Sequence, residues 1–269
     1  MQTGMTLKAT MPAGAPLATL IEQTMAQVRK EPRAVHHRVL LFQLFSLTGQ
    51  LDRAVNQLAV LADIDKENEE MARAYREVLR CEAYRRKVFQ GEKTPLVLGE
   101  PIDWFAQLVE ALRANAMGQH EQAAQLRAQA FDAAPTTGGS ADGTPFTWIA
   151  DADQRFGPVL EALINGKYYW VPFERLASIE LEAPVDLRDL VWLPATLTFT
   201  TGATQVAFIP ARYPDSETSA DDEIRLARRT DWQDVGFDTY FGSGQRMLAT
   251  DAGEFGLFDL RRITLQAAV

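Results

Sequence analysis

Apolar side chains recur every three or four residues through the first half of the chain, the spacing that places them on one face of a helix. The pattern predicts two helix hairpins with tight turns at Thr48-Gly49-Gln50 and Met117-Gly118-Gln119, and one longer helix between the hairpins. The apolar runs of the hairpins cover residues 35–47 and 51–62, and residues 105–112 and 123–131. The longer helix is predicted over 68–90, with Asn68 as its N-cap and Gly91 at its end.

The second hairpin resembles a tetratricopeptide repeat. Counting from Gly118, the small residues Ala123 and Ala130 and the proline Pro135 fall where that repeat has its two small packing positions and its terminating proline. The first hairpin, which turns at Gly49, matches less well, so a generic helical bundle stays open as an alternative. A helical-repeat domain of this kind presents a groove that accepts a partner's helix.

Beyond the helices the pattern changes to short strands. Residues 135–145 are rich in glycine, proline and small polar side chains, which is the composition of a linker. Strands are predicted at Tyr168-Tyr169-Trp170 and around Ile179 and Leu181, and a β-hairpin over 190–209. The other predicted elements are a helix over 155–163 and strands at 247–249 and 255–265.

The chain is therefore expected to have two domains. Residues 1–134 are predicted to be an all-α domain of tetratricopeptide-like repeats, and 135–145 its linker to the rest. Residues 146–269 are predicted to be an α+β domain with a mainly antiparallel sheet.

Composition and the start of the sequence predict a cytoplasmic protein. The chain has 269 residues, of which 46% are hydrophobic and 23% charged, the profile of a globular protein. A single cysteine, Cys81, excludes an intrachain disulfide and is expected to be unreactive. The start lacks the pattern of a signal peptide, and no apolar run is long enough for a membrane helix.

Charge argues against nucleic acid as a partner. Residues 1–134 hold 16 basic and 16 acidic side chains, whereas residues 135–269 hold 11 and 20, so the net charge of −9 belongs to the second half. That half would repel a phosphate backbone. The basic cluster of the first half, Arg80, Arg85, Arg86 and Lys87, is expected to be a solvated helix face.

Asp151 and Asp153 are the strongest chemical candidates. Two carboxylates two residues apart at a strand end can chelate a divalent ion that bridges nucleotide phosphates, as in a metal-dependent nucleotide-sugar transferase. The structural alternative is that Asp153 caps the following helix while Asp151 accepts from turn amides or pairs with Arg155. His36 and His37 diverge on a helix and cannot chelate one metal together, and the sequence has neither H-x-x-x-H spacing nor a cysteine pair. It also has no G-x-S-x-G motif, so no metal, cofactor or catalytic site is expected.

The segment 165–194 contains the sequence's most distinctive motifs, with three consecutive aromatics and acid–arginine neighbours. Together with Trp148 to Glu161 before it and Phe208 to Pro214 after it, this segment resembles the ImpE/TagJ (SciE-type) family of bacterial type VI secretion accessory proteins. The motif residues, expected to be structural, are Asp151, Asp153, Arg155, Tyr169, Trp170, Pro172, Phe173, Arg188 and Asp189.

The resemblance implies a non-enzymatic cytoplasmic adaptor without cofactors. Its implied partner is the small subunit of the contractile sheath, bound through that subunit's N-terminal helix, with a link to the sheath-disassembly ATPase. A groove lined by Leu41, Phe42 and Phe45, with Trp104 and Phe105, is one prediction for the binding surface. Packing of the same side chains in the core is the stronger explanation for most of them.

Overall fold

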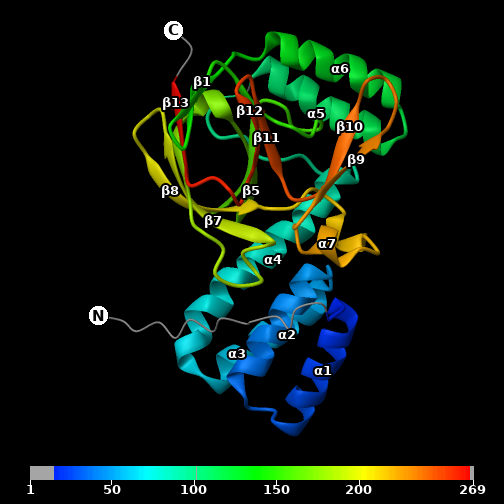
Figure 1. Cartoon of the computed structure of the whole chain (residues 1–269), viewed down its shortest axis with the longest axis vertical. Helices are drawn as coiled ribbons and strands as arrows, with labels where there is room; N and C mark the ends of the chain where they lie inside the picture. Colours follow the sequence, from blue (N-terminus) through cyan, green and yellow to red (C-terminus); the bar gives the residue numbers. More distant parts are fainter. Residues whose placement is uncertain (1–14, 101, 267–269) are drawn as a thin grey trace.

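The computed structural model describes residues 15–100 and 102–266, and in it a helical region precedes a mainly antiparallel β region (Figure 1). This order confirms the predicted fold class. The helices of the first region are α1 (Leu17–Lys30), α2 (Val35–Leu47), α3 (Leu51–Ile64), α4 (Glu69–Phe89), α5 (Asp103–Ala116) and α6 (His120–Ala133). Within the described ranges, no helix combines the length and the apolar character needed to cross a lipid bilayer.

Both predicted hairpins form, as α2–α3 and α5–α6. Their turn glycines, Gly49 and Gly118, have φ values of 68° and 75°, which lie in the left-handed region that glycine adopts most easily. The long helix α4 also forms; it ends at Phe89, and Gly91, with a φ of 77°, follows its C-cap residue Gln90. Asn68 occupies the predicted N-cap position, but its side chain makes no cap hydrogen bond. Asp65 instead caps a short 3₁₀ turn ahead of α4.

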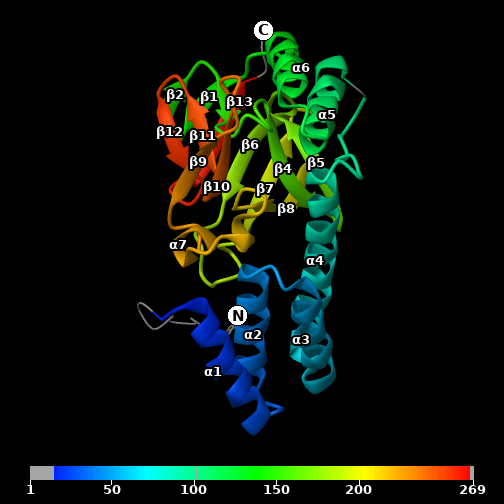
Figure 2. The same cartoon turned by 90° about the vertical axis from the view of Figure 1, so that its right-hand side faces the viewer.

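Helix α4 lies between the two hairpins and connects them. It begins beside α3, runs along the sheet, and leads to α5 and α6 at the far end (Figure 2). The two hairpins therefore lie at opposite ends of α4. Helix α1, which the sequence analysis did not predict, packs on α2 through buried residues with helical spacing, among them Leu17, Leu20 and Ile21.

The β region is built on an eight-stranded sheet with the order β2-β1-β13-β6-β7-β8-β4-β5, and every pairing in it is antiparallel. Its strands are β1 (Gly138–Ala141), β2 (Thr144–Phe146), β4 (Val159–Ile164), β5 (Lys167–Pro172), β6 (Leu176–Leu181), β7 (Trp192–Phe199), β8 (Thr204–Pro210) and β13 (Arg262–Gln266). The predicted strands at 168–170 and 179–181 and the hairpin within 190–209 are confirmed as β5, β6 and β7–β8.

Two small sheets and a short helix complete this region. Strands β12 (Gly253–Gly256), β11 (Met247–Thr250) and β3 (Ile149–Asp151) form one sheet, and β10 (Tyr240–Gly244) and β9 (Thr230–Asp234) form the other. Helix α7 (Asp222–Arg225) lies just before β9. The predicted strand at 247–249 is confirmed, whereas β9 and β10 were not predicted.

Two predictions for this region are wrong. Residues 135–145 are not simply a linker, because they contain β1 and the start of β2, and β1 pairs with β13. A Cβ atom at Gly139 would clash with the carbonyl of Thr264, so the close approach of these strands explains the glycine. Residues 155–163 form a turn and then strand β4, not a helix.

The large sheet is covered on both faces, which explains its apolar strands. One face of β4, with Val159 and Leu163, packs with the helices in a core that also contains Trp170. The other face, with Leu160 and Ala162, belongs to a second core together with residues of β11 and β13. Because β4 is buried on both sides, its sequence lacks the alternation of apolar and polar residues that marks a half-exposed strand.

Candidate functional site

Asp151 ends strand β3, and its side chain is fully buried. Its carboxylate accepts hydrogen bonds from Tyr213 Oη at 3.0 Å and from the Asp153 amide at 2.9 Å, and it pairs with Arg246. Burial raises the pKa of Asp151 to about 7, although the charge of Arg246 acts to lower it. Of the two structural roles predicted as alternatives for Asp151, the bond to a turn amide is the one observed, and Arg155 pairs with Asp153.

Asp153 holds together the turn that follows β3. Its carboxylate pairs with Arg155, accepts from the Arg155 amide at 2.8 Å, and accepts from the Gly242 amide at 2.7 Å. The prediction that Asp153 caps a helix is wrong, because the next regular element is strand β4. Its carboxylate nevertheless satisfies backbone amides as a cap would.

The carboxylates of Asp151 and Asp153 are thus already engaged by arginines and amides inside the protein. A divalent ion would have to displace these partners from a site whose side chains are fully buried. Over residues 15–100 and 102–266, no three His, Cys, Asp or Glu side chains are grouped to hold a metal ion. The geometry therefore gives no support to the transferase alternative.

Glu161 is the centre of a larger buried network between α4 and the sheet. It lies on the helix-facing side of β4, where Arg85 of α4 donates from Nε at 2.7 Å and from Nη2 at 2.8 Å to its two carboxylate oxygens. Arg246 pairs with the same carboxylate, and Tyr168 Oη donates to it. Burial raises the pKa of Glu161, but Arg85 and Arg246 outweigh this effect and hold the pKa below its ordinary range.

A second buried acidic residue, Glu82 of α4, extends the network. Its carboxylate accepts from Trp192 Nε1 of β7 at 2.9 Å and from Arg85 Nη1 at 3.2 Å. The expectation of a solvated basic face on α4 is therefore wrong for Arg85, which is buried, while Arg80 and Lys87 are exposed.

Two residues of the β region also bind the ends of the first helices. Arg212 Nη1 donates to the Leu47 carbonyl at the end of α2 at 2.8 Å, and the Leu17 amide at the start of α1 donates to Asp222 Oδ2 at 2.8 Å. Each contact satisfies a backbone group that a helix end leaves free and places a favourable charge at that end.

The motif residues Arg188 and Asp189 have separate roles. Arg188 pairs with Asp186, with 2.9 Å between Nε and Oδ2, and its guanidinium carbon lies 4.7 Å from the ring centre of Tyr75 on α4. Asp189 accepts from the amides of Val185 and Asp186 at 2.9 and 3.1 Å. The two neighbours thus fix the loop before β7 and contact α4 without pairing with each other.

The remaining motif residues pack in or next to the core. Trp170 and Phe173 are buried, and Phe156 lies 5.4 Å from Trp170 between ring centres. Pro172 ends β5, and half-buried Tyr169 forms a parallel bridge with Leu96 at the sheet edge. These motif residues therefore pack and pair the strands of the sheet.

The residues predicted to line a partner groove fall into two separate groups. Leu41, Phe42 and Phe45 lie on α2 and Trp104 and Phe105 on α5, at opposite ends of α4, and all five are buried (Figure 2). The structure therefore does not bring them together in one groove. Leu41 and Phe45 form the floor of a small hollow of about 260 Å³ between α1, α2 and α3. That these residues bind a partner stays a prediction.

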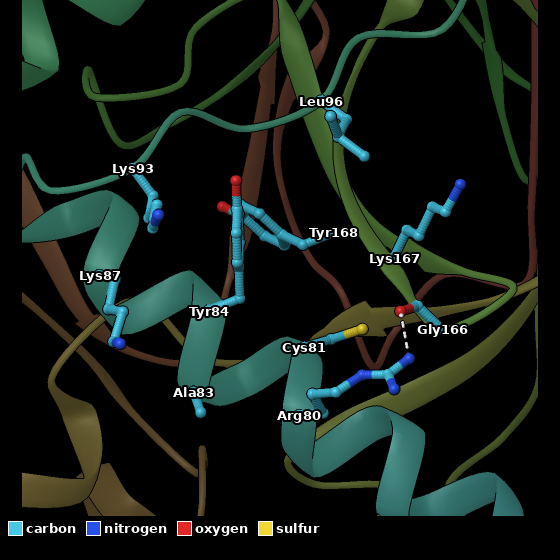
Figure 3. A pocket seen from close by; sticks show the side chains of 10 residues that line it. All are labelled: Arg80, Cys81, Ala83, Tyr84, Lys87, Lys93, Leu96, Gly166, Lys167 and Tyr168. Carbon is cyan, nitrogen blue, oxygen red and sulfur yellow. Dashed lines mark hydrogen bonds between the residues drawn. The ribbon is translucent and has the colours of Figure 1, made fainter.

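A larger groove, which we call the α4 groove, lies between α4, the segment 93–96 and the β4–β5 turn (Figure 3). Its volume is about 460 Å³. Tyr84 and Tyr168 approach each other in it, with 6.4 Å between ring centres, and Leu96 on its wall is 41% exposed. Burial raises the pKa of Cys81 at its floor to about 11, so this thiol is protonated at neutral pH, as expected of an unreactive cysteine.

Sequence reasoning missed the centre of the buried network. The carboxylate of Glu161 and its partners Arg85 and Arg246 are 76 and 85 residues apart in the chain, so spacing could not join them. One local signal was present: Glu161 is the single charged residue in the apolar run VLEALI. A lone carboxylate in such a run indicates a buried partner of opposite charge.

Comparison with known proteins gives the same family as the sequence motifs. The model of the ImpE protein family matches residues 143–264. The chain is 48% identical over 240 residues to the type VI secretion system accessory component TagJ of Pseudomonas aeruginosa, covering 89% of this chain and 84% of that protein. Its fold matches the crystal structure of protein VPA1032 from Vibrio parahaemolyticus with a TM-score of 0.87 and 22% identity, over 94% and 95% of the two chains. The identity to TagJ extends over most of both chains, and the chain therefore belongs to the ImpE/TagJ family.

Proposed function

We propose that this protein is a non-enzymatic accessory component of a type VI secretion system that works in the cytoplasm as an adaptor. The observation that carries the proposal is the 48% identity to the TagJ accessory component over 89% of the chain. The engagement of Asp151, Asp153 and Glu161 in buried ion pairs supports a structural use of the acidic residues that otherwise suggest chemistry.

The proposed partner is the small subunit of the contractile sheath, bound through that subunit's N-terminal helix. The family resemblance implies this partner, and a protein with grooves along its helices offers surfaces of the kind that accept an amphipathic helix. Binding of the sheath subunit would link the sheath to its disassembly ATPase.

Titration calorimetry with the purified full chain and the purified sheath small subunit tests this function. We expect a complex at micromolar concentration that is lost when the subunit lacks its first helix. A subunit in which the same helix has a scrambled sequence is the matched control for a change in length. The absence of any complex with the intact subunit at micromolar concentration would overturn the proposal.

Contact with the ATPase is a separate question for the same preparations. Adding the ATPase to the sheath subunit with and without the adaptor shows whether the adaptor increases their association, measured by co-elution in size-exclusion chromatography. Equal co-elution in both mixtures would remove the link to disassembly while leaving the binding of the subunit intact.

A further inference from the structure

The α4 groove concentrates positive charge in a protein whose net charge is −9. Three of the six lysines of the chain, Lys87, Lys93 and Lys167, lie around it together with Arg80 (Figure 3). In the part of the chain that the structure describes, none of these three lysines forms an ion pair, whereas Arg80 pairs with Glu77. The groove therefore has a cationic rim whose lysines are available to an incoming anionic group.

The inner surface of the groove is apolar and held in place. Tyr84 Oη donates to the Thr94 carbonyl at 2.9 Å, which fixes the segment 93–96 against α4. Both backbone groups of Leu96 form hydrogen bonds with strand β5: its amide donates to the Tyr168 carbonyl at 3.2 Å, and its carbonyl accepts from the Trp170 amide at 2.9 Å. A large apolar side chain is thus kept exposed next to cationic ones.

The same hydrogen bonds restrict how a ligand can bind. Strand β5 is the edge of the large sheet, and Leu96 already pairs with it at this point, so a partner cannot add a strand there. A ligand must instead use side chains, with apolar groups against Leu96 and Tyr84 and anionic groups toward the lysines. A phosphate backbone fits less well, because it offers no apolar group and the acidic β region would repel it.

We propose that the α4 groove is the docking surface for an acidic, amphipathic helix of a partner protein. Its apolar residues pack on Leu96 and Tyr84, and its carboxylates face Lys87, Lys93 and Lys167. This proposal rests on the proposed function, for which it names the surface that takes the sheath subunit. Charge complementarity of this kind sets specificity and the rate of association.

The first test measures binding of an acidic helix to the groove without the sheath subunit. The probe is a short synthetic helix with leucine at every third or fourth position and glutamate elsewhere, and fluorescence anisotropy measures its binding to the full chain. In Lys87→Glu/Lys93→Glu/Lys167→Glu we expect binding to weaken about tenfold or more, because three attractive charges become repulsive. In the matched control Lys30→Glu/Arg33→Glu/Lys66→Glu, with the same change in net charge at exposed positions of the helical region, binding should stay within about twofold of wild type.

Three outcomes of this first test would overturn the groove assignment. They are no binding of the acidic helix by the wild type, equal binding by the wild type and the groove variant, and tighter binding of a single-stranded oligonucleotide than of the helix. Thermal unfolding of all three proteins, followed by circular dichroism, confirms that each variant is folded.

The second test repeats the comparison with the sheath small subunit. Groove-dependent loss of subunit binding supports both proposals. If the subunit binds the groove variant as well as it binds the wild type, the adaptor function stands and the assignment of its surface is wrong. If the acidic helix binds wild type but not the groove variant, and the sheath subunit binds neither protein, the sheath function is wrong. The assignment of the groove to an acidic amphipathic helix then still stands.

Discussion

Replacing Glu161 by glutamine tests whether the buried ion pairs hold the helical region on the sheet. The Glu161 carboxylate is fully buried and is shared by Arg85, at 2.7 and 2.8 Å, and Arg246. In Glu161→Gln the amide keeps one acceptor oxygen but turns an NH₂ group toward a guanidinium, so two buried cations lose their common counter-charge. Removing one partner of a buried pair costs about 3–5 kcal/mol. That loss is a large part of the roughly 5–15 kcal/mol by which domains are stable.

Urea unfolding followed by circular dichroism measures this loss. With a slope of about 3 kcal/mol per molar urea, the midpoint of Glu161→Gln should fall by about 1–2 M relative to wild type. The matched control is Glu110→Gln, which breaks a pair with Arg113 of 2.7 Å on α5, where the two side chains are 56% and 41% exposed. An exposed pair is worth less than about 1 kcal/mol, so this midpoint should move by less than about 0.3 M. Equal shifts in the two variants would refute the reasoning.

The remaining predictions concern pH and the hairpin turns. Because the pKa of Glu161 is lowered in the folded state, its contribution to the free energy of unfolding is complete at pH 7 and is lost as pH falls below about 4.3. The urea midpoints of wild type and Glu161→Gln should therefore lie closer together at pH 3.5 than at pH 7. The pKa of Asp151 is raised to about 7 from about 3.9 in the unfolded chain, so its contribution has the opposite sign: it is complete below about pH 3.9 and is lost as pH rises to about 7. Asp151→Asn should therefore cost most near pH 4 and least near pH 8.5, and a constant cost would contradict this. Gly118→Ala should lower the free energy of unfolding in urea by about 1–2 kcal/mol, because alanine is strained at the positive φ of this residue. Gly49→Ala should lower it further, because its Cβ atom would also clash with the side chain of Glu217. Equal losses would show that the Glu217 side chain moves aside without cost.

The helices were the most predictable part of the fold. In α5, for example, Phe105, Leu108 and Leu112 are buried at helical spacing, so the sequence pattern and the buried face coincide. Strand β7 was predictable for the same reason, since alternate residues such as Leu193, Ala195 and Leu197 are buried. Where an element has one buried face, its period appears in the sequence.

Prediction failed for elements that do not have one buried and one exposed face. Strand β4 is buried on both faces, and its continuous apolar run gave a helix over 155–163 instead. Strand β1 has the composition of a linker because Gly139 must let a neighbouring strand approach closely. In the candidate site, Asp151 and Asp153 were found because they are two residues apart in the chain, whereas the partners of Glu161 meet it only after folding.

The buried contacts between the helical region and the sheet also make the α4 groove a preformed surface. Arg85 with Glu161 and Glu82 with Trp192 join α4 to the strands, and Arg212 binds the end of α2. Rotating one region against the other would leave buried charges without partners, at a cost of several kcal/mol each. Because α4 and the β4–β5 turn form facing walls of the groove, fixing their orientation also fixes its width. A partner helix therefore meets a groove that is already in shape, and its affinity is not reduced by the free energy of ordering one.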